Sequence, residues 1–117
     1  MRENTIERIE SMVRPPNWDG LQGKPVSSAA CRLAAEFFQK AFDRGIPHPK
    51  FVSPSALGAI AFQWDTPGYR LKVRVFSGRG QVCHFEWIQL PDSVEEGHDD
   101  IDAAVDRLSG FFGEGLR

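Results

Sequence analysis

The chain has 117 residues, of which 41% are hydrophobic and 11% aromatic, and a formal net charge of -2 at pH 7. This length fits one core, so we expect residues 1–117 to form a single domain, and the apolar fraction excludes an intrinsically disordered chain. The near-neutral charge excludes a general electrostatic attraction to nucleic acid or to an anionic membrane.

The first predicted helix runs from about Thr5 to Arg14. Asn4 is a good N-cap, and Glu7 follows three residues later, as in a capping box. The apolar residues of this segment recur at helical spacing and share one face. Pro15-Pro16 then ends the helix, because the residue before a proline disfavours helical backbone angles.

A second, stronger helix is predicted from about Ser28 to Arg44. Ser27 is a good N-cap, and Gly45 can end the helix. Glu36 and Lys40 form a favourable pair four residues apart. The apolar residues make one broad face: Ala30, Leu33, Ala34, Phe37, Phe38, Ala41 and Phe42. Such a face favours packing flat against a sheet.

In the second half of the chain the apolar residues recur with period two, which is typical of strands. This alternation predicts three strands joined by tight turns: residues 60–65, 70–75 and 83–87. A short fourth strand near Phe51 and Val52 is expected at an edge of the sheet, bounded by Pro49 and Pro54. The pattern indicates an antiparallel meander with one apolar and one polar face.

The last predicted helix runs from about Asp99 to Phe112. We interpret the carboxylates between Asp92 and Asp106 as acids that favour a helix start, with Asp99 or Asp100 as the N-cap. The predicted element order is ααβ(β)ββα. The fold class is therefore α+β, an antiparallel meander of three to four strands with helices packed on one face.

One loop carries a family resemblance. It reads Asn17-Trp18-Asp19-Gly20 and continues, three residues later, with Lys24-Pro25-Val26-Ser27. This segment resembles a group of small bacterial proteins that read approximately Asn-Trp-Asp-Gly-Tyr-Gly-Ala-Lys-Pro-Ile-Ser, although Leu21 stands where that group has tyrosine. The resemblance covers about Val13 to Trp87. It implies a fold and carries over no catalytic residue, because no activity is assigned to the group.

The same loop is the first candidate site. Trp18 could stack on a ligand while Asp19 accepts a hydrogen bond or coordinates a cation. In the alternative, structural interpretation, the side chains of Asn17 and Asp19 bind nearby backbone amides and Gly20 supplies a positive φ. Trp18 would then fill one end of the core. The structural interpretation is favoured, because such turns are common and the further oxygen ligands of a calcium loop are absent.

The polar face of the predicted sheet is the second candidate site. Arg70, Lys72 and Arg74 alternate with apolar residues and therefore project together, and His84 and Glu86 are expected on the neighbouring strand. This face could bind an acidic protein partner or a phosphate. It could also be a solvated face with weak cross-strand ion pairs. A nucleic-acid contact has less support, because the face lacks an array of stacking aromatic residues.

Catalytic and metal chemistry find little support in the sequence. Cys31 and Cys83 are predicted to be buried structural thiols. Cys83 and His84 are adjacent in a strand and point to opposite faces, which excludes a nucleophile–base dyad. The acidic segment suggests a metal site by composition alone, around Glu95, His98, Asp99 and Asp102, without a defined ligand spacing. We predict no catalytic residue, no metal and no cofactor.

The leading functional hypothesis is a non-enzymatic protein-interaction domain: an adaptor, an accessory subunit or an inhibitor-like protein. The alternative is a small-molecule binder or small enzyme that uses the Trp18 and Asp19 loop, and the third is a weak nucleic-acid contact through the basic strand. The partner is expected to be another protein, with a homodimer through a sheet edge as an open alternative. The charged start and the lack of a long apolar segment predict a cytoplasmic protein without a membrane anchor.

Overall fold

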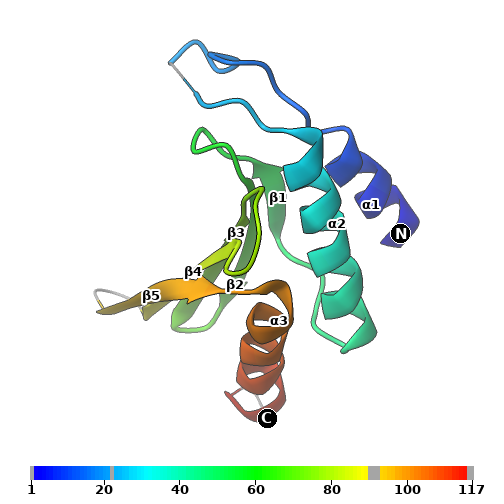
Figure 1. Ribbon diagram of the computed structural model, residues 1–117. Helices are drawn as coiled ribbons and strands as arrows, with labels where there is room; N and C mark the ends of the chain where they lie inside the picture. The colour runs from blue at the N-terminus through cyan, green and yellow to red at the C-terminus, as the bar shows by residue number, and fades with distance from the viewer. Residues whose placement is uncertain (1, 22, 90–92, 116–117) are drawn as a thin grey trace.

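The computed structural model describes residues 2–21, 23–89 and 93–115. Two N-terminal helices precede a five-stranded antiparallel meander and a C-terminal helix (Figure 1). The helices are α1 (Arg2–Glu10), α2 (Ser28–Asp43) and α3 (Ile101–Gly110), and α3 continues as a π-helical turn, η1 (Phe111–Gly115). The predicted α+β class is confirmed, and the element order is ααβββββα.

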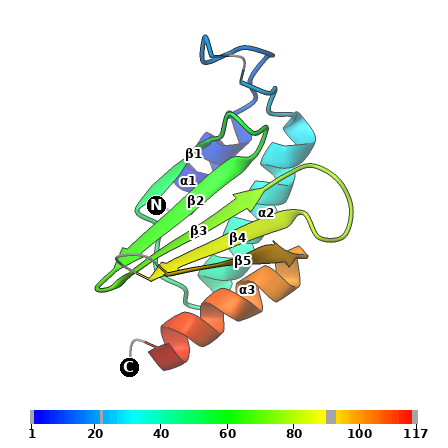
Figure 2. The same cartoon turned by 90° about the vertical axis from the view of Figure 1, so that its left-hand side faces the viewer.

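The five strands form one sheet in the order β1-β2-β3-β4-β5, so each strand pairs with its neighbours in the chain. They are β1 (Phe51–Pro54), β2 (Ile60–Thr66), β3 (Tyr69–Val75), β4 (Cys83–Gln89) and β5 (Ser93–Asp99). The helices pack on one face of this sheet, and Figure 2 looks onto the sheet with α2 behind it. The short edge strand predicted between two prolines is β1.

The core lies between α2 and the helix-covered face of the sheet, which we call the inner face. Phe37 of α2 is fully buried, and its ring centroid lies 5.0 Å from that of Phe62 and 6.4 Å from that of Trp64. The inner face of β2, β3 and β4 carries buried side chains: Ile60, Phe62, Trp64, Leu71, Val73, Val75, Cys83 and Phe85. The residues that alternate with them form the opposite, outer face.

The helix ends follow from local hydrogen bonds. Ser27 Oγ accepts from the backbone N–H of Ala30 at 3.1 Å, which confirms the predicted cap of α2. The first helix lies closer to the N-terminus than predicted: Asn4 is inside it, so the prediction that Asn4 caps it is wrong, and its C-terminal end also comes earlier. It ends at Glu10, and the chain then pairs with residues before α2: Arg14 and Val26 exchange two backbone hydrogen bonds of 3.0 Å. This bridge requires extended backbone and so stops the helix before the two prolines.

The acidic segment before α3 is a strand, and its interpretation as part of a helix start is wrong. β5 pairs with β4 along its whole length, from Cys83 opposite Asp99 to Gln89 opposite Ser93. The predicted N-cap is confirmed for Asp100: its Oδ1 accepts from the N–H of Ala103 at 2.7 Å and caps α3. The sheet therefore has five strands instead of three to four.

The acids of β5 are tolerated in the sheet because α3 supplies their countercharge. Arg107 Nε donates to Asp99 Oδ2 at 2.8 Å, its Nη1 lies 3.9 Å from Glu95 Oε1, and its guanidinium carbon lies 3.8 Å from the ring centroid of Phe85. Gly97 lies opposite Phe85, and a β-carbon there would approach the Phe85 ring to 2.9 Å. Arg107 thus joins β5 to α3 across the inner face.

Candidate functional site: the outer face of the sheet

The outer face presents a continuous set of polar side chains from four strands. The strand register places Gln63, Lys72, Glu86 and Glu96 in one cross-strand row. The next row contains Ala61, Arg74, His84 and His98. Arg70, Lys72 and Arg74 thus project on one face of β3, with His84 and Glu86 beside them on β4, as the alternation predicted. The capacity of this face to bind a partner depends on which of its charged side chains are already paired within the protein.

Arg70 is paired with a carboxylate of the neighbouring strand. Its Nε donates to Asp65 Oδ1 at 3.1 Å, and Lys50 Nζ donates to Asp65 Oδ2 at 3.2 Å. Desolvation raises the pKa of the Asp65 carboxyl, but hydrogen bonds from Lys50, Gln63 and Arg70 outweigh it and leave this pKa below its ordinary value. Asp65 therefore stays ionised and holds two of the cations near the edge of the sheet.

Arg74 makes weaker contacts with β4. Its Nη1 donates to His84 Nδ1 at 3.3 Å, and its Nη2 lies 4.0 Å from Glu86 Oε1. Because a guanidinium can only donate, His84 Nδ1 is the acceptor, and neutral His84 carries its proton on Nε2. That Nε2 lies 3.7 Å from Glu96 Oε2. One hydrogen bond and one long ion pair leave most of the five N–H donors of Arg74 unused.

Lys72 makes no ion pair with any residue that the structure describes. Together with Arg74 it lines a pocket of about 230 Å³ on the outer face, between β1, β2 and β3. The rest of the lining includes Phe51, Ser53, Ser55, Ala61 and Gln63. The pocket therefore combines two cations with hydroxyl and amide groups, which is a donor set suited to an anion.

The sequence identified the two cations of this pocket but missed its hydroxyls. Ser53 and Ser55 reach it because β1 pairs with β2 in a register that places Ser53 opposite Ala61. A signal was available, since the two serines are two residues apart and flank Pro54. The pairing register of so short a strand could not be inferred from the sequence.

The Trp18 loop uses its polar groups internally. Asp19 Oδ1 accepts from the backbone N–H groups of Leu21 at 2.9 Å and Gly23 at 2.8 Å, and these bonds lower the pKa of the Asp19 carboxyl. Trp18 Nε1 donates to Lys24 O at 3.0 Å. Gly20 has φ +74°, as the turn interpretation predicted.

Trp18 does not fill one end of the core, and that expectation is wrong. The loop extends away from the helices and the sheet (Figure 1), and Trp18 is outside the buried cluster. The guanidinium carbon of Arg14 lies 5.9 Å from its ring centroid. The tryptophan therefore stabilises the loop itself.

The thiols are remote from the outer face. Cys83 is fully buried on the inner face, where desolvation raises its pKa to about 12, while His84 points to the outer face. Cys31 is also buried, and desolvation raises its pKa. In the ranges that the structure describes, no three side chains of the metal-binding types come together. Among the described residues, no helix has the length and apolar character needed to cross a membrane.

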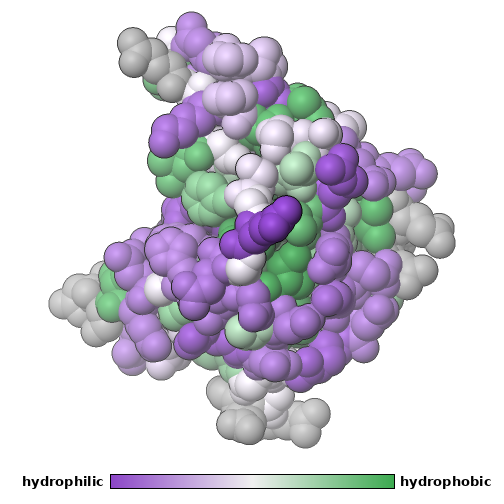
Figure 3. Space-filling model, viewed as in Figure 1, coloured by the Kyte–Doolittle hydropathy of each residue, from purple (hydrophilic) through white to green (hydrophobic). Residues whose placement is uncertain are grey.

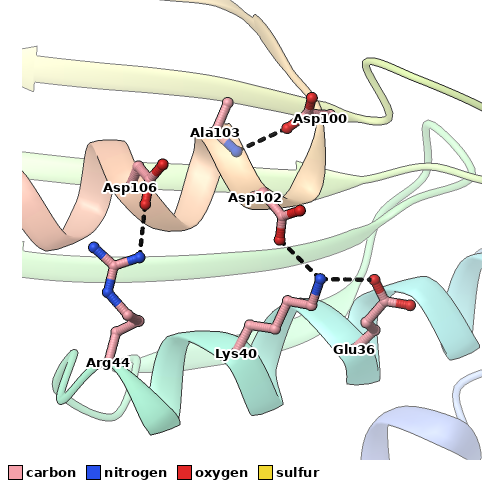
Figure 4. Close-up of polar contacts among 7 residues, drawn as sticks. All are labelled: Glu36, Lys40, Arg44, Asp100, Asp102, Ala103 and Asp106. Carbon is pink, nitrogen blue, oxygen red and sulfur yellow. Dashed lines mark hydrogen bonds and ion pairs between the residues drawn. The ribbon is translucent and has the colours of Figure 1, made fainter.

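A second concave region lies between α2 and α3. This groove has a volume of about 320 Å³ and is lined by Lys40, Asp43, Arg44, Asp102, Val105 and Asp106. Its cations are paired across the groove: Lys40 Nζ lies 2.8 Å from Asp102 Oδ1, and Arg44 Nη1 lies 2.6 Å from Asp106 Oδ1 (Figure 4). Figure 3, in the orientation of Figure 1, shows a small hydrophobic area near the middle of the molecule bordered by hydrophilic residues.

Comparisons of the chain with protein-family models, with curated proteins and with solved structures find no match. The resemblance to small bacterial proteins therefore stays a prediction.

Proposed function

We propose that the protein is a non-enzymatic protein-interaction domain that binds an acidic partner through the outer face of its sheet. The observation that carries this proposal is the pocket at Lys72 and Arg74, where two cations meet and the described residues supply a single long ion pair, 4.0 Å from Arg74 to Glu86. On the same strand, by contrast, Arg70 pairs with Asp65 at 3.1 Å. Two cations with so little countercharge, beside hydroxyl groups, favour an anionic group from outside the chain.

The chemistry of the face supports binding more than catalysis. Cys83, the nucleophile nearest in sequence to the polar strand residues, is buried on the other side of the sheet with a raised pKa. The histidine beside it, His84, accepts a hydrogen bond from Arg74 and faces Glu96. Neither side chain is arranged to activate the other.

An acidic protein fits the outer face better than nucleic acid. The cations occupy β3, while the adjoining strands present Glu86 and Glu96 on the same face. A phosphate backbone that followed the basic strand would run beside these carboxylates, which repel it. A protein can instead place one acidic side chain in the pocket and basic or neutral groups beyond it.

The sheet edges disfavour a homodimer. β1 is four residues long, ends in Pro54, and receives a hydrogen bond of 3.4 Å from Arg8 Nη2 to Val52 O. β5 carries Glu95 and Glu96, so two copies paired along this strand would bring like charges together. The proposed partner is therefore a different protein.

Charge reversal on the outer face tests the proposal. Native purification from the source cells with quantitative mass spectrometry should recover a stoichiometric protein partner with the wild-type chain. Lys72→Glu and Arg74→Glu should lose it, because each places a carboxylate where the partner's acid docks. Arg32→Glu is the matched control, since Arg32 is an exposed cation on α2. Equal recovery with all four chains, or no partner with the wild type, would contradict the proposal.

A further inference from the structure

We propose that the pocket between β1, β2 and β3 receives a phosphoryl group carried by a side chain of the partner. This inference rests on the proposed function and makes the interaction dependent on phosphorylation of the partner. The donors that line the pocket, its charge and its size all favour such a group.

The donor side chains of the pocket can all bond to a phosphoryl group, which offers more acceptor sites than a carboxylate does. Lys72 contributes an ammonium without an ion pair, and Arg74 contributes guanidinium N–H groups beyond the one given to His84. Ser55 Oγ accepts from the N–H of Leu57 at 3.2 Å, so its own hydroxyl proton is free to donate. Ser53 adds a second hydroxyl to the lining. A phosphoryl group offers three acceptor oxygens to such a set.

The charge and the volume of the pocket also favour a phosphoryl group. A phosphorylated serine or threonine carries a charge of roughly −1.5 to −2 at neutral pH, so two adjacent cations attract it more strongly than they attract the single charge of a carboxylate. The pocket volume of about 230 Å³ is below the roughly 300 Å³ at which sites for whole small molecules begin. It therefore suits a phosphoryl group and the first atoms of a side chain better than a complete nucleotide.

The test is a titration of the ¹⁵N-labelled full chain with O-phosphoserine at neutral pH, followed by NMR. We expect saturable shifts in the amides of β1, β2 and β3. Lys72→Gln and Arg74→Gln should each weaken binding by about tenfold, the effect of losing one charge-assisted hydrogen bond. Arg70→Gln is the control: it removes a cation from the same face of the same strand, but Arg70 is held by Asp65 outside the pocket. Its affinity should equal that of the wild type.

Two further probes identify the group that binds. Glutamate, a carboxylate, should bind about tenfold more weakly than O-phosphoserine, because it brings less charge and fewer acceptors. Adenosine monophosphate should bind no more tightly than O-phosphoserine. Equal binding of glutamate, tighter binding of the nucleotide, or equal losses in all three variants would overturn the inference, as would the absence of saturable shifts. Circular dichroism of each variant verifies that it is folded.

The titration and the partner purification fail in distinguishable ways. A partner lost with Lys72→Glu and Arg74→Glu, but no preference for O-phosphoserine over glutamate, would overturn the phosphoryl inference and leave the interaction domain standing. O-phosphoserine binding at the pocket without any protein partner would overturn the assignment of the phosphoryl group to a protein and, with it, the proposed function.

Discussion

The helix groove and the outer-face pocket are built from similar residues and differ in how their charges are balanced. Each contains two cations that lie close together in the chain: Lys40 of α2 with Arg44 at the C-cap of that helix, and Lys72 with Arg74 on β3. In the groove both cations meet an aspartate of α3 within 2.8 Å. In the pocket, the only ion pair that the described residues provide is the one of 4.0 Å at Arg74.

Residue types alone therefore do not define a binding site. A paired cation must give up its partner before it can bind an external anion, while an uncompensated one gains a partner on binding. The groove therefore serves mainly to hold α3 against α2. The pocket retains cations that the fold uses only weakly, through one hydrogen bond of 3.3 Å and one ion pair of 4.0 Å, both made by Arg74.

Both the groove and the pocket depend on the packing of α2 against the sheet. A substitution in that interface should lower the stability of the protein more than any other described below. Phe37→Ala removes a fully buried ring that contacts Phe62 and Trp64. We expect a loss of about 3–5 kcal/mol in the free energy of unfolding, measured with chemical denaturant. Phe42→Ala is a control on the same helix, because 48% of Phe42 is exposed, and its loss should be smaller. An unchanged midpoint for Phe37→Ala would contradict the packing of α2.

The next largest effect concerns β5, which borders the outer face. In Gly97→Ala the new β-carbon would lie 2.9 Å from Cε1 of Phe85, a ring held by Arg107 and by burial. We expect a loss of about 1–3 kcal/mol, as for other overpacked sites, measured by thermal and chemical denaturation. Gly110→Ala is the matched control, since a β-carbon there meets no atom within 4 Å. Equal stability of the two variants would refute the close approach of β5 and Phe85.

The fifth strand also shows why part of the fold could not be predicted. The caps of α2 and α3 and the alternation in β2, β3 and β4 are local signals, and they identified these elements. The inner positions of β5 are instead Glu95, Gly97 and Asp99, which have no apolar period. What makes them acceptable is Arg107, a residue of the following helix. That information is tertiary and is absent from any local window of the sequence.

The candidate site was also only partly predictable from the sequence. Lys72 and Arg74 were predictable, because alternation within one strand fixes the face on which they lie. The sequence could not predict whether these cations are free to bind an external anion, because that depends on which acids the neighbouring strands bring close. Asp65 reaches Arg70, whereas Glu86 stays 4.0 Å from Arg74. Strand register decides both distances, and a sequence pattern does not fix register at this precision.

Removing Asp65 should make a second region of the outer face resemble the pocket. Asp65→Asn releases Arg70 and Lys50, so O-phosphoserine should produce additional shifts near the β2–β3 turn, measured in the same NMR titration.

Because the pKa of Asp65 is lowered from 3.8, the stability that this carboxylate contributes is present above that value and is lost as the pH falls through its lowered pKa. The variant should lack this acid-dependent loss. Identical acid unfolding of variant and wild type would contradict the role of Asp65.

The groove between α2 and α3 should contribute least to stability, and freeing one of its cations tests whether an unpaired cation is enough to bind an anion. Asp106→Asn leaves Arg44 without its partner at 2.6 Å. Since both side chains are largely exposed, the free energy of unfolding should fall by only about 0.2–1 kcal/mol. The freed guanidinium should nevertheless acquire weak O-phosphoserine binding, seen as new shifts in α2 and α3.

Asp43→Asn is the matched control for this gain. Asp43 lines the same groove and is bonded by Gln39 Nε2 at 2.8 Å, so its removal takes away one negative charge without releasing Arg44. If both variants gained the same binding, net charge alone would explain anion binding in this protein. If only Asp106→Asn gained it, the deciding property would be an uncompensated cation in a concave site. That is the property on which the assignment of the outer-face pocket depends.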